Sequence, residues 1–203
     1  MGINAILLRQ FLVDSEAVCR HTSRVPEMSY LSLGSNLGDR AANLREAILR
    51  LDVAGPARAV SAFYETQPVE VLDQPWFLNC VLAIETEKPP RELLNLALSI
   101  EKAMGRLRTR DKGPRKIDID IVLFGDRIVD EPGLTIPHPS MHLRRFVLEP
   151  LAEIAPAARH PILGKTAREL LAALPPGEAV GRLDEPPGAA RKPRLSKSRT
   201  GKL

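Results

Sequence analysis

The sequence predicts an α+β fold of the ferredoxin-like, split βαβ type, with elements in the order β-α-β-β-α-β. Two observations support this prediction. Apolar residues repeat at helical spacing in two segments, residues 44–51 and 89–105. Segments rich in strand-forming residues lie before, between and after them. We also expect additional short strands and a C-terminal helix.

The four main strands are expected at residues 29–33, 57–66, 77–86 and 117–124. The second and third are separated by "QPVEVLDQPW", a loop with two prolines. The fourth, "IDIDIVLF", has the Ile, Val and Leu content of a buried strand. The next segment, "GDRIVD", indicates a turn into a short strand.

Both predicted helices have recognisable ends. In the first, apolar residues recur at i, i+3, i+4 and i+7 from Leu44, and Asp39 suits the positive end of the helix dipole. In the second, Pro90 lies near the first position and Gly105 suits the end.

The chain is long enough for one domain. It has 203 residues, of which 44% are hydrophobic and 27% charged, as in ordinary globular proteins. We expect the working domain at 28–175, preceded by an N-terminal extension at 1–27. Residues 176–203 are rich in Pro, Gly, Ala and charge, and we expect a disordered basic tail there.

The positive net charge belongs to the tail. Residues 190–203 hold six Lys or Arg and no acid, and without them 23 basic residues face 25 acidic ones, a net charge of −2. The body therefore does not favour a nucleic-acid partner.

Membrane and redox features point to a cytoplasmic protein. The apolar stretch "AILLRQFLV" is short and is broken by Arg9 and Gln10, so no membrane association is expected. The two cysteines, Cys19 and Cys80, have no metal-binding spacing and form no disulfide framework.

Two carboxylates interrupt the fourth strand. Asp118 and Asp120 point to one face, roughly 7 Å apart along the chain, while Ile117, Ile119 and Ile121 point into a core. A hard divalent cation such as Mg²⁺ would relieve their repulsion. The alternative is a strand whose polar face is simply in water.

A group of basic residues precedes the carboxylates. Arginine suits bidentate phosphate recognition, and arginines beside a metal pair are what phosphoryl transfer needs. No glycine-rich phosphate loop of the Walker type is present, so side chains and metal would bind the phosphates. The alternative is a solvated basic loop. The group comprises Arg106, Arg108, Arg110, Lys112, Arg115 and Lys116.

Two further sites are open to more than one interpretation. His138 lies between two prolines, where it would either bind a phosphate or face water. Phe77 and Asn79, two residues apart, would either stack on and read a flat ring, or pack in the core and cap the strand.

Six motifs occur in an order that resembles the 6-hydroxymethyl-7,8-dihydropterin pyrophosphokinase family, from about residue 29 to 173. The resemblance implies transfer of pyrophosphate from ATP to the pterin hydroxymethyl group, with release of AMP, in folate biosynthesis. It implies these two small molecules as partners, and we expect a monomer. The motifs are "YLSLGSNLGDR", "SAFYETQPV", "DQPWFLN", "EKAMGRLR", "GPRKIDIDIVLFG" and "LTIPHPSMHLRRFVLEPLAEIAP".

The same resemblance implies residue roles. Two Mg²⁺ ions would be held by Asp118 and Asp120, and these two carboxylates with Arg106 and Arg115 would form the catalytic set. ATP would contact Glu101, Arg106, Arg108, Arg115, Ile121, His138 and Arg144. The pterin would lie between Phe77 and Phe146, with its edge read by Asn79 and by the backbone around Thr66 and Val69.

Two alternatives come from other classes. Split βαβ domains often bind RNA, but here the carboxylates occupy the strand where such modules place aromatic residues. A different metal-dependent enzyme, a nuclease or a nucleotidyl transferase, would use the same pair. The aromatic residues Phe77 and Phe146 and the match of all six motifs argue against it.

Overall fold

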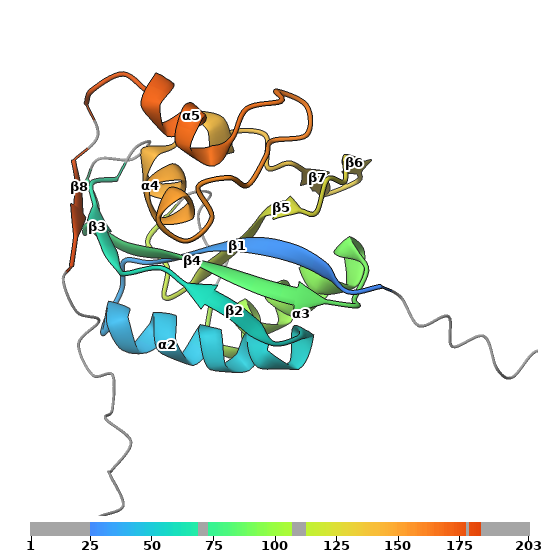
Figure 1. The fold of residues 1–203 in the computed structure, drawn as a ribbon. Coiled ribbons are helices and arrows are strands. Elements are labelled where there is room, and N and C mark those ends of the chain that lie inside the picture. Colours follow the sequence, from blue (N-terminus) through green and yellow to red (C-terminus); the bar gives the residue numbers. More distant parts are fainter. Residues whose placement is uncertain (1–24, 69–72, 107–112, 178, 184–203) are drawn as a thin grey trace, which may run out of the picture.

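The computed structural model describes residues 25–68, 73–106, 113–177 and 179–183. They form three layers, with a central antiparallel sheet between two pairs of helices (Figure 1). This arrangement confirms the predicted mixture of helices and antiparallel strands. None of the helices in these ranges has the length and apolar character needed to cross a membrane.

The sheet has six strands. Its order is β5-β1-β4-β3-β8, and β2 pairs with β4 beside β3. Every pairing is antiparallel. The strands are β1 (Glu27–Ser35), β2 (Ala57–Val60), β3 (Tyr64–Thr66), β4 (Phe77–Thr86), β5 (Asp118–Phe124) and β8 (Val180–Arg182). A separate hairpin joins β6 (Val129–Glu131) to β7 (Leu134–Ile136).

Helices cover both faces of the sheet (Figure 1). The lower face, as drawn, carries α2 (Arg40–Leu51) and α3 (Pro90–Ala103). The upper face carries α4 (Arg145–Ile154) and α5 (Ala167–Ala173). Two short 3₁₀ turns complete the described elements, η1 (Asp52–Ala54) and η2 (Met141–Leu143).

The helix ends follow from local chemistry. The Asp39 side chain caps α2 by accepting the Ala42 N–H at 2.9 Å. Pro90 occupies the first turn of α3, where its missing N–H has no cost. Gly105 ends that region with a φ of 89°, which a glycine adopts without strain. These three predicted boundaries are confirmed.

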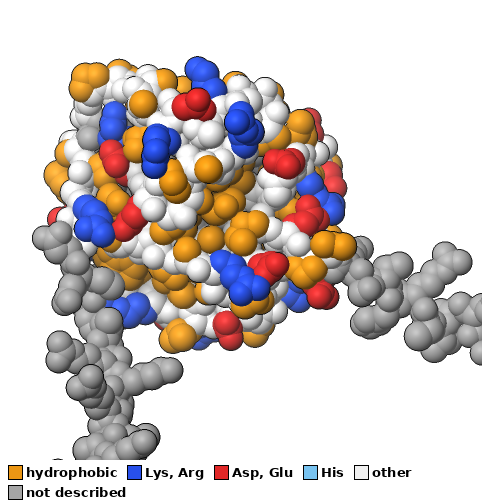
Figure 2. Space-filling model, viewed as in Figure 1, with side chains coloured by type: hydrophobic (Ala, Val, Ile, Leu, Met, Phe, Trp, Pro, Cys, Tyr) orange, Lys and Arg blue, Asp and Glu red, His pale blue; other side chains and the backbone are white. Residues whose placement is uncertain are grey.

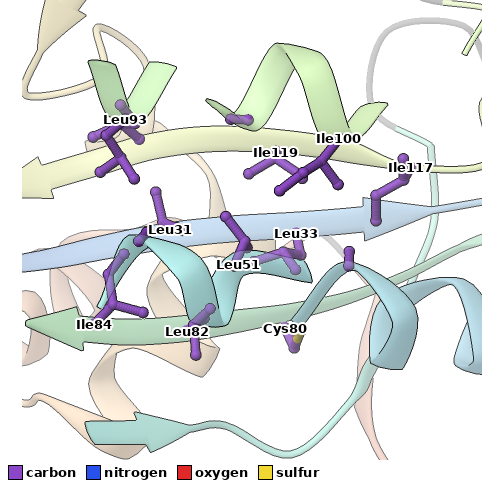
Figure 3. Close-up of a cluster of buried hydrophobic side chains, with 14 of the residues drawn as sticks. Leu31, Leu33, Leu51, Cys80, Leu82, Ile84, Leu93, Ile100, Ile117 and Ile119 are labelled. Atoms are coloured by element: carbon purple, nitrogen blue, oxygen red, sulfur yellow. The ribbon is translucent and has the colours of Figure 1, made fainter. Parts of the chain in front are cut away.

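Two hydrophobic clusters lie on opposite sides of the sheet. The lower cluster joins β1, β4 and β5 to α2 and α3 through side chains such as Leu33, Leu82 and Ile119 (Figure 3). The upper cluster joins Val81 and Val122 to α4 and α5. The sheet is therefore anchored from both faces by apolar burial.

The structure differs from the predicted strands most clearly in two places, besides β1, which extends from the expected 29–33 to Glu27–Ser35. The expected strand at 57–66 is divided into β2 and β3, because the Ser61 Oγ accepts the Val81 N–H at 2.9 Å and interrupts the ladder. At the other end, β8 lies beyond residue 175, where the sequence places the end of the domain, and pairs with β3. A strand of three residues with no alternating apolar pattern gives no recognisable sequence signal.

Candidate active site

The strand β5 has different chemistry on its two faces. Ile119 and Ile121, together with Ile117 just before the strand, are buried in the lower cluster. Asp118 and Asp120 are half-buried on the other face. The predicted two-faced strand is confirmed.

The carboxylates share their face with groups on the neighbouring strands. Gly34 on β1 lies opposite Asp118 on one side and opposite Asn79 on the other, and cross-strand partners point to the same face. A Cβ added to Gly34 would lie 2.6 Å from the Asn79 Oδ1. The glycine therefore leaves room between the carboxylates and Asn79. We call this side of the sheet the functional face, comprising Gly34, Thr66, Phe77, Asn79, Asp118 and Asp120.

One end of the functional face is suited to a flat polar ring. The buried Asn79 Nδ2 donates to the Thr66 Oγ1 at 2.7 Å, which fixes the plane of the amide. Thr66 lies opposite the half-buried Phe77 in the β3–β4 ladder. The Asn79 amide and the Phe77 ring thus lie on the same face of the sheet, as expected for residues two apart on a strand.

The other end holds a cluster of charges. The Arg106 Nη1 donates to the Asp118 Oδ1 at 2.6 Å and also contacts Glu101. The Arg115 Nε lies 3.0 Å from the Asp118 Oδ2. Glu101 is only 3% exposed, and its Oε1 accepts the Ile119 N–H at 2.8 Å. Two of the guanidinium groups expected to bind phosphates, those of Arg106 and Arg115, are therefore held by carboxylates of the same site.

Burial makes negative charge costly here. It raises the pKa of Asp120 to about 7, with the Asp118 carboxylate adding to the shift and Arg144 opposing it. Burial also raises the pKa of Glu101, although its hydrogen bonds and Arg106 act in the other direction. A cation beside Asp120 would stabilise the ionised carboxylate.

The donor set fits Mg²⁺ in a partial shell. Carboxylate oxygens are its preferred protein ligands, and it commonly completes its shell with water and phosphate oxygens. No group of three His, Cys, Asp or Glu side chains that could hold a metal occurs in the described ranges. Asp118 and Asp120 would thus leave positions open to a substrate.

Two arginines link the charged end to the aromatic rings. The Arg115 guanidinium carbon lies 5.4 Å from the Phe77 ring centroid, and that of Arg144 lies 5.6 Å from the Phe146 centroid. Both aromatic residues expected to stack on a ring are therefore next to guanidinium groups.

The surroundings of His138 favour its neutral imidazole. Burial and the nearby Arg144 lower its pKa, while Asp118 acts in the other direction. Its Nδ1 accepts the Ser140 N–H at 3.2 Å, which leaves the proton on Nε2. The backbone N–H of His138 donates to the Val122 O at 3.0 Å and fixes this residue beside β5.

Not every predicted site residue is on the functional face. The Ile121 side chain lies in the lower core, so only its backbone is left to line a nucleotide site. Arg108 and Val69 lie outside the described residues.

Two residues of the site were not expected from the sequence. Besides Gly34, Asn36 joins both ends: its Oδ1 accepts the Arg115 N–H at 2.8 Å, and its Nδ2 lies 3.2 Å from the Gln74 Oε1 and the Pro75 O. An isolated glycine inside a strand pattern signals a close approach, and that signal was available in "LGSN". Nothing in the sequence indicates the contacts of Asn36, because its partners lie far away along the chain.

The geometry defines a class of protein first. An antiparallel sheet that presents paired carboxylates, guanidinium groups and aromatic rings on one face is suited to an enzyme that handles a nucleotide and a flat ring. Residues 30–156 match the family described as 7,8-dihydro-6-hydroxymethylpterin-pyrophosphokinase (HPPK). The chain belongs to this family.

Relatives with a known name also point to this family. A 2-amino-4-hydroxy-6-hydroxymethyldihydropteridine pyrophosphokinase of Methylorubrum extorquens is 49% identical over 150 residues, covering 73% of this chain and 94% of the relative. The protein of the same name from Pseudomonas aeruginosa is 42% identical over 162 residues, covering 79% and 97%. The folic acid synthesis protein fol1 of Schizosaccharomyces pombe is also 42% identical, and the match spans 79% of this chain but only 22% of fol1.

A solved structure shares the fold. The wild-type HPPK-DHPS of Plasmodium falciparum superposes with a TM-score of 0.59 at 18% identity. The match covers 72% of this chain and 44% of the Plasmodium chain, so this chain spans less than half of that protein.

Proposed function

We propose that this chain transfers pyrophosphate from ATP to the hydroxymethyl group of 6-hydroxymethyl-7,8-dihydropterin, giving the pterin diphosphate and AMP in folate biosynthesis. The single observation that carries the proposal is the 49% identity to a named pyrophosphokinase of which 94% is covered. The functional face supplies matching chemistry at both of its ends.

The charged end would bind the triphosphate. Arg106 and Arg115 would exchange part of their contact with Asp118 for phosphate oxygens, since guanidinium groups bind phosphates bidentately. The neutral His138 would donate its Nε2 proton to a phosphate, and Arg144 would add a further charge. Arg108 stays a predicted phosphate contact. A nucleotide would meet Ile121 through its backbone, while Glu101 holds Arg106 and the edge of β5.

Mg²⁺ is part of the proposal. Asp118 and Asp120 would hold two ions, and bound Mg²⁺ would neutralise the phosphates and the developing charge. The raised pKa of Asp120 supports this, because the carboxylate lacks a sufficient counter-charge without a cation.

The other end would bind the pterin. Phe77 and Phe146 would stack on its two faces, and Asn79 would read the hydrogen-bonding edge in the plane set by Thr66. Val69 stays a predicted backbone contact. The hydroxymethyl oxygen would then face the charged end, release its proton to solvent and attack the β-phosphorus. The bond from that phosphorus to the oxygen bridging the α- and β-phosphates would break, and AMP would leave with that oxygen.

Finer structural points belong to the same proposal. The ferredoxin-like assignment is supported by the antiparallel order β5-β1-β4-β3. The division into an extension at 1–27, a domain from 28 and a basic tail is retained, with β8 added to the domain. A monomer in the cytoplasm remains our expectation.

The alternatives have less support. On the face seen in Figure 2, Lys and Arg side chains are interspersed with acidic and hydrophobic ones, which offers nothing to the RNA-binding interpretation. The family match leaves no observation that favours a nuclease or a nucleotidyl transferase.

The test determines which phosphorus atom of ATP is attacked. The purified chain is incubated with ATP, Mg²⁺ and 6-hydroxymethyl-7,8-dihydropterin, with an EDTA control, and the nucleotides are separated. Metal-dependent AMP and a pyrophosphorylated pterin are expected. ADP in place of AMP would mean γ-phosphoryl transfer and would overturn the proposal.

A further inference from the structure

One carboxylate outside the charged end joins three elements. Glu153 lies in the last turn of α4. Its Oε2 accepts the Ala62 N–H at 2.9 Å and the Tyr64 O–H at 3.1 Å, and its Oε1 accepts from the Arg182 Nη2 at 3.0 Å. It therefore connects α4 to the β2–β3 break, to β3 and to β8, which meet at one end of the sheet (Figure 1).

These contacts are partly shielded from water. The Glu153 side chain is 26% exposed and Tyr64 is 6% exposed. Burial and the carboxylate together raise the pKa of Tyr64 to about 12, so the hydroxyl remains a donor at every physiological pH. Hydrogen bonds to a charged acceptor are stronger than neutral ones.

The hydrogen bonds of Glu153, which we call the Glu153 network, connect it to the strand that forms the sheet side of the proposed pterin site. Tyr64 lies opposite Asn79 in the β3–β4 ladder and opposite Arg182 in the β3–β8 ladder. Two residues after Tyr64, Thr66 holds the Asn79 amide. The position of β3 therefore sets where Thr66 and Asn79 lie.

The same network leads to the helix side. Phe146 lies in the first turn of α4, seven residues before Glu153. Residues i and i+7 lie on one side of a helix, about 10 Å apart along its axis. A bond that holds Glu153 to β3 therefore also sets the distance of Phe146 from the sheet.

We propose that Glu153 is a positioning residue that fixes Phe146 against Thr66 and Asn79 through Ala62, Tyr64 and Arg182. This inference rests on the proposed function, because that function assigns Phe146, Thr66 and Asn79 to the pterin. Glu153 itself touches no substrate. It acts on the spacing of the two sides of the pterin site through its hydrogen bonds to Ala62, Tyr64 and Arg182.

The test separates the two substrates. Glu153→Ala, Glu153→Gln and Tyr64→Phe are compared with wild type in steady-state kinetics, and pterin binding is measured by calorimetry with Mg²⁺ and a non-hydrolysable ATP analogue. The control is Glu46→Gln, which removes the same charge from an exposed i, i+4 pair with Arg50 on α2, on the opposite side of the sheet.

The expected result is selective. Glu153→Ala raises the KM and the Kd for the pterin about tenfold, a loss of ~1.4 kcal/mol, and leaves the KM for ATP unchanged. Glu153→Gln and Tyr64→Phe, which each keep part of the network, raise the pterin KM about threefold, and Glu46→Gln has no effect.

Three outcomes would overturn the inference: unchanged pterin constants, an equal rise for both substrates, or a fall in kcat alone. The last is what a smaller folded fraction produces. If Glu153→Ala does not fold, Glu153→Gln and Tyr64→Phe decide by the same criteria. A wild-type chain that forms no pterin diphosphate overturns the proposed function and this inference with it, whereas an active wild type with unchanged variants overturns the inference alone.

Discussion

The two faces of the sheet solve different physical problems. The lower face packs Leu31, Leu33, Ile119 and Ile121 against α2 and α3, and all four side chains are at most 5% exposed. The functional face holds the carboxylates of Asp118 and Asp120 beside Arg106 and Arg115. One strand, β5, contributes to both.

Both sides of the sheet bury apolar residues, but among these side chains the buried charged groups lie on the functional face alone. Apolar burial on the lower face favours folding regardless of pH or ligands. The functional face keeps charge in a partly buried setting, which costs free energy, and under the proposed function a cation and phosphates would offset that cost. A rigid, apolar lower face is what allows the costly groups to stay in position.

The sharpest test of the contrast removes one carboxylate. Asp120→Asn is expected to lower kcat by at least about 10³-fold, because in the proposed site Mg²⁺ would lose a ligand. Without metal the same change should stabilise the fold by roughly 1–3 kcal/mol at pH 8, since an ionised, half-buried carboxylate is removed. Turnover assays and urea unfolding in EDTA measure the two effects.

The pH dependence gives the control for that variant. The folded pKa of Asp120 is raised from 3.8 to about 7, so the folded state holds a proton that the unfolded chain releases. Metal-free wild type should therefore lose stability as pH rises from about 4 to 7, and the advantage of Asp120→Asn should vanish below pH 4. A variant that is less stable than wild type at pH 8 would contradict the assignment.

A change on the lower face should do the opposite. Leu44 on α2 is fully buried, and Leu44→Ala should cost ~2–5 kcal/mol of the free energy of unfolding by removing contacts and leaving a cavity. Per folded molecule, kcat and both KM values should stay within about twofold of wild type. Urea unfolding together with kinetics at 10 °C checks this, and a selective change in one KM would show that the two faces are not independent.

A smaller effect is expected at Gly34. The added Cβ of Gly34→Ala would lie 2.6 Å from the Asn79 Oδ1 and 3.7 Å from the Phe77 ring, so Asn79 must shift. The KM for the pterin should rise about tenfold while binding of an ATP analogue is unchanged.

The matched control is another glycine of the same sheet. A Cβ at Gly181 on β8 would approach no atom closer than 3.9 Å, so Gly181→Ala should leave the pterin KM unchanged. If both variants behave alike, the close approach at Gly34 has no functional meaning.

The smallest effect is expected at Cys80. It lies in the lower cluster, and burial raises its pKa to about 12, so the reactive thiolate is scarce at pH 8. Iodoacetamide should leave the Cys80 peptide unmodified in the native protein and alkylate it in 6 M urea, as read by mass spectrometry. Alkylation of the native protein would show that this face opens to solvent.

Much of the contrast between the two faces of the sheet can be predicted from the sequence alone. The alternation in "IDIDI" separates carboxylates from isoleucines, because side chains alternate along a strand. Asp39, Pro90 and Gly105 mark helix ends through interactions with their immediate neighbours. The six motifs also point to the family that residues 30–156 match.

Such local sequence patterns do not predict contacts between residues that are far apart in the sequence. The division of residues 57–66 depends on Ser61 meeting Val81, and the addition of β8 depends on pairing with a strand more than 100 residues earlier. The close approach at Gly34 exists because β4 and β5 pair on either side of it, and the contacts of Glu153 exist because the end of α4 lies beside β3. Local periodicity encodes which face a residue occupies, whereas its partners across the sheet exist only once distant segments have packed together.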